Sequence, residues 1–281
     1  MKSIKFTVFD IDGTILPGDT ALSKNMLDVI HGLIDKGIMV GFATGRNFHF
    51  ASEVADQIKG KFYLAINNGA VIMQYPSKKI ISETYLTSED VEMVRKSLQE
   101  KRHPCLLNAT MHSKEKTFIF NDPPLRQPII NFVENQKKEF FSFENVFETK
   151  EKLFSCLYAT VPSSMIEKEV AEFRKEFPHL NFTYIADPIC VGFHWLGLMP
   201  ANTGKENLLK YFKKEYFAKN HQILAAGDDM NDIGMLQEAG LSIAMGTAPD
   251  LVKRAADLCI GTAKDDSLCK YLRHHFLTKQ K

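Results

Sequence analysis

The sequence predicts an α/β protein with a Rossmann-like core of parallel strands and an inserted α+β cap domain. Three observations lead to this prediction. Apolar runs typical of strands alternate with helical patterns in the first third of the chain, the pattern becomes mixed in the middle, and the first pattern returns near the end. We expect the core at residues 1–85 and 190–281, and the inserted domain at residues 86–189.

The first third of the chain contains three predicted strands and two predicted helices. The run IKFTVFD is apolar almost throughout, as expected for a parallel strand that is covered on both faces. SKNMLDVIHGLIDKG has helical spacing, with Ser23 as the N-cap and Gly37 as the stop. IMVGFATG and FYLAINNG are the next strands, with the helix NFHFASEVADQIKG between them. Such alternation indicates a doubly wound parallel sheet.

The middle of the chain has a different pattern. AVIMQYPSKKIISETYL predicts a hairpin around Pro76, TSEDVEMVRKSLQE a helix, KTFIFN and LFSCLYATV strands, and SMIEKEVAEFRKEF an amphipathic helix. The core pattern resumes with the helix KENLLKYFKKEYF, the strand QILAAGDD, the helix DIGMLQEAG, the strand LSIAMG, the helix LVKRAAD and the short strand LCIG. One core interrupted by one insertion is the simplest architecture for this order of elements.

Composition and charge exclude several classes of protein. Of the 281 residues, 44% are hydrophobic and 25% charged, which is typical of a globular protein, and a net charge of +1 gives no support for binding to nucleic acid or membranes. No apolar run approaches the ~20 residues that span a bilayer, and no signal-peptide stretch precedes Asp10. Five scattered cysteines without a CxxC pair predict free thiols. We therefore expect a cytoplasmic protein.

Polar residues follow three predicted strands at the point where each strand ends. The segments are FDIDGT, ATGR and AGDDMNDIGM, and in open parallel sheets ligands bind outside the carboxyl ends of the strands. Asp10, Asp12 and Asp228 would then converge at one edge. Clustered carboxylates repel one another unless a cation holds them, and oxygen donors without His or Cys favour Mg²⁺. The sequence therefore predicts a magnesium site with these three aspartates.

These motifs resemble those of the haloacid dehalogenase superfamily of phosphotransferases. DIDGT matches its first motif, Thr44 in ATGR its second, Lys205 in NTGKENLL its third, and GDDMND its fourth. NNGA at residues 67–70 and the long insertion further resemble the Cof-type branch, which has a class-two (C2B-like) cap domain. The resemblance implies a Mg²⁺-dependent phosphatase that acts on a small phosphorylated metabolite, with sugar phosphates favoured.

The resemblance also implies how the carboxylates act. Asp10 is the nucleophile and forms an aspartyl-phosphate, which divides one hydrolysis into two steps. Asp12 protonates the leaving alcohol and then activates water. The implied Mg²⁺ ligands are the carboxylates of Asp10 and Asp228 and the backbone carbonyl of Asp12.

The remaining motif residues have implied roles at the phosphoryl group. Thr44 and Lys205 hold its oxygens and stabilise charge in the transition state. Asp232 supports the site by orienting Lys205. The implied substrate-binding residues are Gly13, Gly45, Arg46, Asn68 and Asn231.

One position departs from the superfamily pattern. Glu206 follows Lys205 where relatives usually have Gly, and an acidic residue at a helix N-terminus is a favourable partner of the helix dipole.

Asp12 separates the chain from the dehalogenases of the superfamily, which lack this acid, and from its ATPases, which have Thr there. Two alternatives stay open, a phosphomutase of the same superfamily and a non-catalytic phosphosugar-binding protein. The sequence leaves the metabolite, the residues that select it and the oligomeric state undecided.

Overall fold

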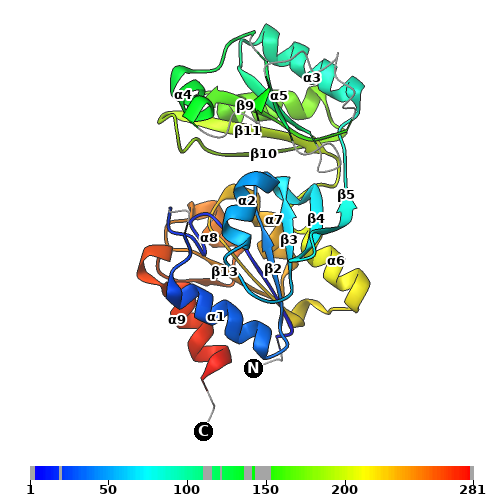
Figure 1. The fold of residues 1–281 in the computed structure, drawn as a ribbon. Coiled ribbons are helices and arrows are strands. Elements are labelled where there is room, and N and C mark those ends of the chain that lie inside the picture. Colours follow the sequence, from blue (N-terminus) through cyan, green and yellow to red (C-terminus); the bar gives the residue numbers. More distant parts are fainter. Residues whose placement is uncertain are drawn as a thin grey trace. The chain divides into compact units, whose positions relative to one another are not determined.

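The chain folds into two compact units, which Figure 1 shows in the computed structural model. The structure describes residues 4–18, 21–109, 116–120, 122–135, 141–142 and 153–278. The first unit joins both ends of the chain, Met1–Ser82 and Gly204–Lys281, and the second is the intervening segment Glu83–Thr203. Residues far apart in the sequence therefore share the sheet of the first unit.

The first unit is built on a sheet with eight strands among the described residues, in the order β14-β13-β12-β1-β2-β3-β4-β5. The six strands from β14 to β3 are parallel, whereas β4 runs antiparallel to β3. The predicted α/β class with a parallel core sheet is confirmed. The strands are β1 (Phe6–Phe9), β2 (Met39–Ala43), β3 (Phe62–Ile66), β4 (Val71–Tyr75), β5 (Lys79–Glu83), β12 (Ile223–Gly227), β13 (Leu241–Ala244) and β14 (Leu258–Cys259).

Helices connect the parallel strands, and their ends follow the expected signals. Ser23 caps α1 by accepting a hydrogen bond from the backbone N–H of Met26 at 3.1 Å. Gly37 follows the end of α1 with a φ of +75°, which favours glycine. The helices of this unit include α1 (Lys24–Asp35), α2 (Phe48–Ala55), α6 (Asn207–Tyr216), α7 (Ile233–Glu238), α8 (Asp250–Ala255), α9 (Ser267–Leu272) and the short 3₁₀ helices η1 (Asn67–Gly69) and η6 (Met230–Asp232).

The strand order reverses at β1, which lies between β2 and β12. The chain winds from β1 through β2 to β3 on one side, and from β12 through β13 to β14 on the other. Phe9 pairs with both Phe42 and Ala226, so the carboxyl ends of β1, β2 and β12 lie side by side. Ligands of doubly wound sheets bind at such a reversal. The residues that follow these three strands therefore form the expected binding position.

Apolar packing holds α6 against the sheet. Phe6 and Val8 of β1 share one buried cluster with Leu208 and Phe212 of α6. Burying a side chain of this size contributes roughly 1.5–3 kcal/mol, so the cluster fixes the helix firmly. Because Lys205 lies just before α6, this packing also places Lys205 at the carboxyl ends of the strands.

The second unit contains a sheet with six strands among the described residues, in the order β10-β11-β9-β6-β7-β8. β9 pairs antiparallel with β6 and β11, and β11 pairs antiparallel with β10. Its strands are β6 (Cys105–Ala109), β7 (Thr117–Ile119), β8 (Phe141–Ser142), β9 (Phe154–Pro162), β10 (Leu180–Ala186) and β11 (Phe193–Pro200), and its helices α3 (Ser88–Glu100), α4 (Gln127–Asn135) and α5 (Ile166–Glu176).

The strand β11 lies in the second sheet, although the expected boundary at residue 190 assigned it to the core. Leu196 and Leu198 of β11 are buried in the same apolar cluster as Val170 and Phe173 of α5. The run Phe193–Pro200 is apolar and strand-like, a pattern that fits either sheet. Only its pairing with β9 and β10 decides where it belongs.

Candidate active site

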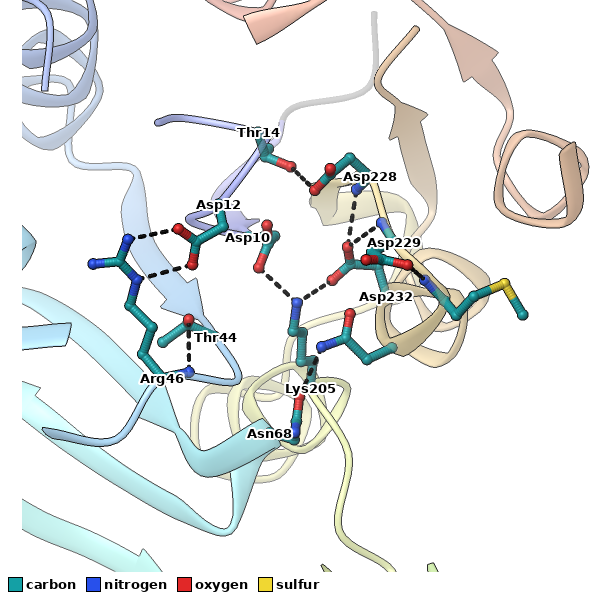
Figure 2. Close-up of polar contacts among 12 residues, drawn as sticks. Asp10, Asp12, Thr14, Thr44, Arg46, Asn68, Lys205, Asp228, Asp229 and Asp232 are labelled. Atoms are coloured by element: carbon teal, nitrogen blue, oxygen red, sulfur yellow. Dashed lines mark hydrogen bonds and ion pairs between the residues drawn. The ribbon is translucent and has the colours of Figure 1, made fainter. Parts of the chain in front are cut away.

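Asp10 is the residue that follows β1, and its side chain is bonded to Lys205. Its backbone N–H donates to the carbonyl of Ala226 at 2.9 Å, which fixes it at the reversal of strand order. The Lys205 ammonium donates to Asp10 Oδ1 at 2.6 Å and to Asp232 Oδ1 at 2.6 Å (Figure 2). All three side chains are buried, with Asp10 only 3% exposed. Such a buried cation is stable because both carboxylates compensate its desolvation.

Asp232 is fixed by the turn that contains it. Its Oδ2 accepts hydrogen bonds from the backbone N–H groups of Asp228 at 2.9 Å and Asp229 at 3.0 Å. Its Oδ1 accepts from Lys205, so both oxygens of this carboxylate already have donors from the protein. A carboxylate with these partners can hold Lys205 in one orientation.

Burial dominates the electrostatics of the site. It raises the pKa of the Asp10 carboxyl well above its ordinary value, while Lys205 lowers this pKa and Asp232 raises it. Burial likewise raises the pKa of Asp228 to about 7, and the Asp232 charge adds to the shift. Burial lowers the pKa of Lys205, but Asp10 and Asp232 together raise it above its ordinary value. Full ionisation of the three carboxylates would exceed the single positive charge of Lys205, so binding of a further cation would favour their ionised forms.

Gly13 allows the loop after β1 to approach Asp228. Its φ of +74° lies in the left-handed region, and a Cβ at this position would overlap the Asp228 carboxylate. Thr14 is buried, and its hydroxyl donates to Asp228 Oδ1 at 3.2 Å. Sequence reasoning gave Gly13 a role in substrate binding and gave Thr14 none. The Thr of the DIDGT motif was the signal that could have indicated this contact.

Arg46 holds the carboxylate of Asp12. Its Nε donates to Asp12 Oδ2 at 2.9 Å and its Nη2 to Asp12 Oδ1 at 2.6 Å, while its Nη1 donates to the carbonyl of Phe50 at 3.0 Å. Figure 2 shows Asp12 directed toward Arg46 and Asp10 directed toward Lys205. The Asp12 side chain is 54% exposed, in contrast to the buried Asp10. Arg46, which we expected to contact substrate, is thus bonded to the expected acid/base residue.

The other expected phosphate- and substrate-binding residues lie in one cluster of loops. The Thr44 hydroxyl accepts a hydrogen bond from the backbone N–H of Arg46 at 3.1 Å, and its carbonyl accepts from the N–H of Asn68 at 2.9 Å. Asn68 Oδ1 accepts from Asn231 Nδ2 at 2.9 Å, and a Cβ at Gly45 would lie 3.3 Å from the same oxygen. The ends of β2, β3 and β12 therefore bring these side chains together.

Three carboxylates form a candidate metal site within the part of the chain that the structure describes. Asp10, Asp228 and Asp232 each place one oxygen within 4.8 Å of the others. The Asp12 side chain is outside this group, because it is bonded to Arg46. Asp232 already uses both oxygens, so Asp10 and Asp228 are the carboxylates better suited to hold a cation. Oxygen donors alone fit a hard ion such as Mg²⁺.

Glu206 follows Lys205 in the sequence and is the residue just before α6. Its carboxylate lies against Gly204 and Gly234, where an added Cβ would overlap it, and its Oε1 is 3.3 Å from Nζ of Lys210. The side chain thus occupies space that two glycines leave free and pairs with the next turn of the helix. These contacts agree with a local helix-end role for Glu206.

A family model of haloacid dehalogenase-like hydrolases matches residues 7–272. The chain belongs to this family. The match covers the carboxylates, Lys205 and the whole second unit, and it confirms the family that the motifs indicated. It also confirms that this haloacid dehalogenase-like hydrolase is an enzyme.

Named relatives of this hydrolase are phosphatases. The 5-amino-6-(5-phospho-D-ribitylamino)uracil phosphatase YcsE of Bacillus subtilis is 27% identical, over 98% of this chain and 96% of its own. The HMP-PP phosphatase of Yersinia enterocolitica is 26% identical, over 96% of this chain and 94% of its own. The solved structure of the subclass IIB sugar phosphatase BT4131 has a TM-score of 0.76 at 20% identity, and the match covers 98% of this chain and 100% of its own. That last similarity shows a shared fold.

Across the described ranges, no helix of this hydrolase combines the length and the apolar character needed to cross a bilayer. The cytoplasmic location expected from the sequence stays a prediction.

Proposed function

We propose that this haloacid dehalogenase-like hydrolase is a Mg²⁺-dependent phosphatase that hydrolyses a small phosphorylated metabolite through an aspartyl-phosphate at Asp10. The contact between Lys205 and Asp10 carries the proposal, because it sets a buried ammonium 2.6 Å from a buried carboxylate at the reversal of strand order. A fixed cation can stabilise the charge of a transferring phosphoryl group. The carboxylate beside it can act as the nucleophile.

In the proposed first step, a carboxylate oxygen of Asp10 bonds to phosphorus, and the bond from phosphorus to the ester oxygen breaks. Lys205 and Thr44 donate hydrogen bonds to the phosphoryl oxygens. Asp12 gives a proton to the departing oxygen. The exposure of the Asp12 side chain supports this role, since the leaving group must come from solvent and return to it.

In the proposed second step, water attacks the phosphorus of the aspartyl-phosphate, and the Asp10 carboxylate is released together with inorganic phosphate. Asp12 accepts the proton from this water. Arg46 supports the step by holding both oxygens of Asp12 in one orientation. A well-placed general base typically contributes ~10²–10⁴-fold to the rate.

The carboxylates of Asp10 and Asp228, with the backbone carbonyl of Asp12, would hold Mg²⁺. The high pKa of Asp228, caused first by burial and then by the Asp232 charge, supports a cation site, because a bound cation would favour the ionised carboxylate. Bound Mg²⁺ would supply positive charge next to the phosphoryl group and the nucleophile.

The names of two relatives support a narrower chemical class for the proposed substrate. The name of YcsE describes a phosphate on a ribityl chain that is joined to a uracil ring, and BT4131 is named a sugar phosphatase. Both names describe a phosphate monoester of a sugar or polyol. We therefore propose that the substrate of this enzyme is a phosphate monoester on a sugar-like carbon chain.

Trapping the phosphoenzyme tests the mechanism. The Asp12→Ala variant, given p-nitrophenyl phosphate and Mg²⁺, should accumulate a phosphoryl group on Asp10, because an activated leaving group scarcely needs an acid whereas dephosphorylation still needs its base. Mass spectrometry of acid-quenched protein would show and map the added group. The Asp10→Asn variant is the matched control and should show neither the adduct nor turnover. An Asp10→Asn variant with ordinary phosphatase activity would exclude the covalent mechanism.

The same assay separates the two alternatives from the proposed phosphatase. A phosphatase releases one phosphate per ester hydrolysed without any activator. A phosphomutase would release little phosphate and would require a sugar bisphosphate. A non-catalytic phosphosugar-binding protein would bind the ester and leave it intact.

A further inference from the structure

The short turn that follows β3 contacts three other loops of the candidate active site, all of them within the first unit. We propose that this turn, η1 (Asn67–Gly69), here called the NNG turn, positions the phosphate-binding groups without touching the substrate. Asn68 would act through Asn231, and Gly69 through the backbone next to Lys205. This inference rests on the proposed phosphatase function and assigns positioning residues to the same site.

The NNG turn has a backbone conformation that residues with a side chain rarely adopt. Its three residues have φ values of +48°, +53° and +81°, and the first two are asparagines rather than glycines. The left-handed region disfavours residues with a Cβ, although asparagine tolerates it better than most. Such conformations persist where the surrounding structure fixes them, and they are frequent at functional sites. A turn of this kind is held by its neighbours, and here these are the other loops of the site.

The backbone of the NNG turn is hydrogen-bonded to the loop after β2. The N–H of Asn67 donates to the carbonyl of Arg46 at 2.9 Å, and the N–H of Asn68 donates to the carbonyl of Thr44 at 2.9 Å. Thr44 is one of the proposed phosphate ligands. The turn therefore fixes the backbone on both sides of Gly45.

The side chain of Asn68 is already used within the protein. The residue is only 3% exposed, and its Oδ1 accepts a hydrogen bond from Nδ2 of Asn231 at 2.9 Å. A Cβ at Gly45 would lie 3.3 Å from the same oxygen, so the amide is closely packed on that side as well. A ligand that enters from solvent can reach little of such a side chain. Asn68, which we expected to bind substrate, is therefore better placed to orient Asn231.

The contact with Asn68 determines how Asn231 presents its amide. Nδ2 of Asn231 carries two hydrogens, and Asn68 accepts only one of them, so the second suits a phosphoryl oxygen. Oδ1 of Asn231 is inaccessible to solvent and has no hydrogen-bond partner among the described residues. If the amide turned over, this oxygen would face the phosphate, and two acceptors repel each other. Asn68 therefore keeps the donor end of the amide available for the phosphate.

Gly69 brings the NNG turn against the backbone next to Lys205. A Cβ at Gly69 would lie 2.2 Å from the carbonyl oxygen of Gly204 and 3.5 Å from the backbone nitrogen of Lys205. Nδ2 of Asn207 donates to the carbonyl of Gly69 at 3.4 Å, which ties the turn to the first residue of α6. Glycine combines the left-handed φ with this close approach. The turn therefore supports the loop that leads into Lys205.

A double-mutant cycle tests whether Asn68 acts through Asn231. Asn68→Gly keeps the left-handed backbone but removes the amide, and Asn231→Ala removes its partner. Each single variant should weaken the binding of inorganic phosphate, measured by calorimetry with Mg²⁺ present, by about 3–10-fold, the usual contribution of one hydrogen bond. The double variant should bind phosphate as Asn231→Ala does, because Asn68 then has nothing to orient. The kcat/KM for p-nitrophenyl phosphate should fall in parallel.

Lys78→Gly is the matched control for the change in the backbone. Lys78 has a φ of +55° in the exposed turn between β4 and β5, so glycine relaxes the same conformation away from the site. This variant should bind phosphate as the parent enzyme does. Thermal unfolding measures the stability of each variant. A merely structural role of Asn68 would lower the melting temperature without changing the affinity of the folded protein for phosphate.

Gly69→Ala tests the contact next to Lys205. The new Cβ would displace the backbone before Lys205, so kcat for p-nitrophenyl phosphate should fall by ~10²-fold, as expected for a displacement of ~1 Å. Gly192→Ala is the matched control, because Gly192 has a φ of +85° and open space around the position of a Cβ. It should keep the kcat of the parent enzyme. If Gly69→Ala does not fold, the Asn68 cycle decides the proposal by itself.

The outcomes separate this inference from the proposed function. Unchanged phosphate affinity in folded Asn68→Gly or in folded Asn231→Ala overturns it. A double variant whose loss equals the product of the two single losses also overturns it, since Asn68 would then bind phosphate independently. A folded Gly69→Ala with the kcat of the parent enzyme removes Gly69 from the proposal. A parent enzyme that hydrolyses no phosphate ester with Mg²⁺ present overturns the phosphatase function itself, whatever the cycle shows.

Discussion

The Arg46 guanidinium donates two hydrogen bonds to the Asp12 carboxylate, at 2.9 and 2.6 Å. The arginine follows β2 and the aspartate follows β1, and a third hydrogen bond ties Arg46 to the carbonyl of Phe50 in α2. A planar guanidinium with two parallel hydrogen bonds fixes the orientation of a carboxylate as well as its position. We therefore expect Arg46 to act by positioning Asp12.

The first prediction concerns this pair. Arg46→Gln should lower kcat by about 10–100-fold, part of the contribution that a well-placed acid/base group makes. Arg46→Lys should recover only part of that loss, because an ammonium cannot make the same two parallel hydrogen bonds. Steady-state kinetics with an unactivated sugar phosphate would measure both effects. Equal kcat values for Arg46→Gln and the parent enzyme would show that Asp12 needs no such support.

The second prediction compares two glycines that share a left-handed conformation. Gly13 has a φ of +74° and Gly37 a φ of +75°, so the left-handed backbone should by itself cost alanine a similar ~1–2 kcal/mol at both positions. Only at Gly13 would the new Cβ overlap the Asp228 carboxylate, whereas Gly37 has open space. Gly13→Ala should therefore reduce kcat by about 10²-fold or more, as expected when reacting groups are displaced by ~1 Å. Gly37→Ala should keep its activity, and a comparable loss in both variants would refute the argument.

The third prediction concerns metal. EDTA should abolish turnover and Mg²⁺ should restore it, whereas Zn²⁺ should substitute poorly because the donors are carboxylate oxygens. Mg²⁺ should also raise the melting temperature of the parent protein, since a ligand that binds only the folded state stabilises it. The Asp228→Asn variant should show a much smaller shift. Activity that persists after thorough chelation would contradict the proposed site.

The fourth prediction is a pH dependence of stability in the metal-free protein. Burial raises the pKa of Asp228 from 3.8 to about 7, with the Asp232 charge adding to the shift, so the folded state binds more protons than the unfolded state within this window. Stability should therefore fall as pH rises from about 4 to about 7, by ~1.4 kcal/mol for each unit of pKa difference at most.

The Asp228→Asn variant supplies the control for this pH dependence. It lacks the titrating carboxylate, so its free energy of unfolding should fall less steeply over the same window. Asp10, whose pKa is also raised by burial, retains part of the slope in both proteins. Urea unfolding in EDTA, followed across the window, measures the difference between the two proteins. Parallel curves would show that Asp228 ionises as easily in the folded state as in the unfolded state.

The sequence by itself determined the fold class of the first unit and the residues that gather at its edge. Apolar runs that end in FDIDGT, ATGR and AGDDMNDIGM required buried parallel strands with polar ends, and parallel strands bring such ends together. Asp10, Asp12 and Asp228 could be named for this reason, whereas Lys205 was named through the resemblance of NTGKENLL to the third superfamily motif. Local signals such as Ser23 at the start of α1 were also readable, because a cap acts within one turn of its helix.

Tertiary structure alone decided which side chains contact one another. The hydrogen bond from Thr14 to Asp228 and the pairing of Arg46 with Asp12 join residues from different strands, and no local pattern encodes such contacts. From its sequence, the strand β11 could have paired in either sheet, because an apolar strand-like run indicates that a strand is buried but not which strands it pairs with. Periodicity is a property of one segment, whereas strand pairing and side-chain hydrogen bonds depend on where distant segments meet.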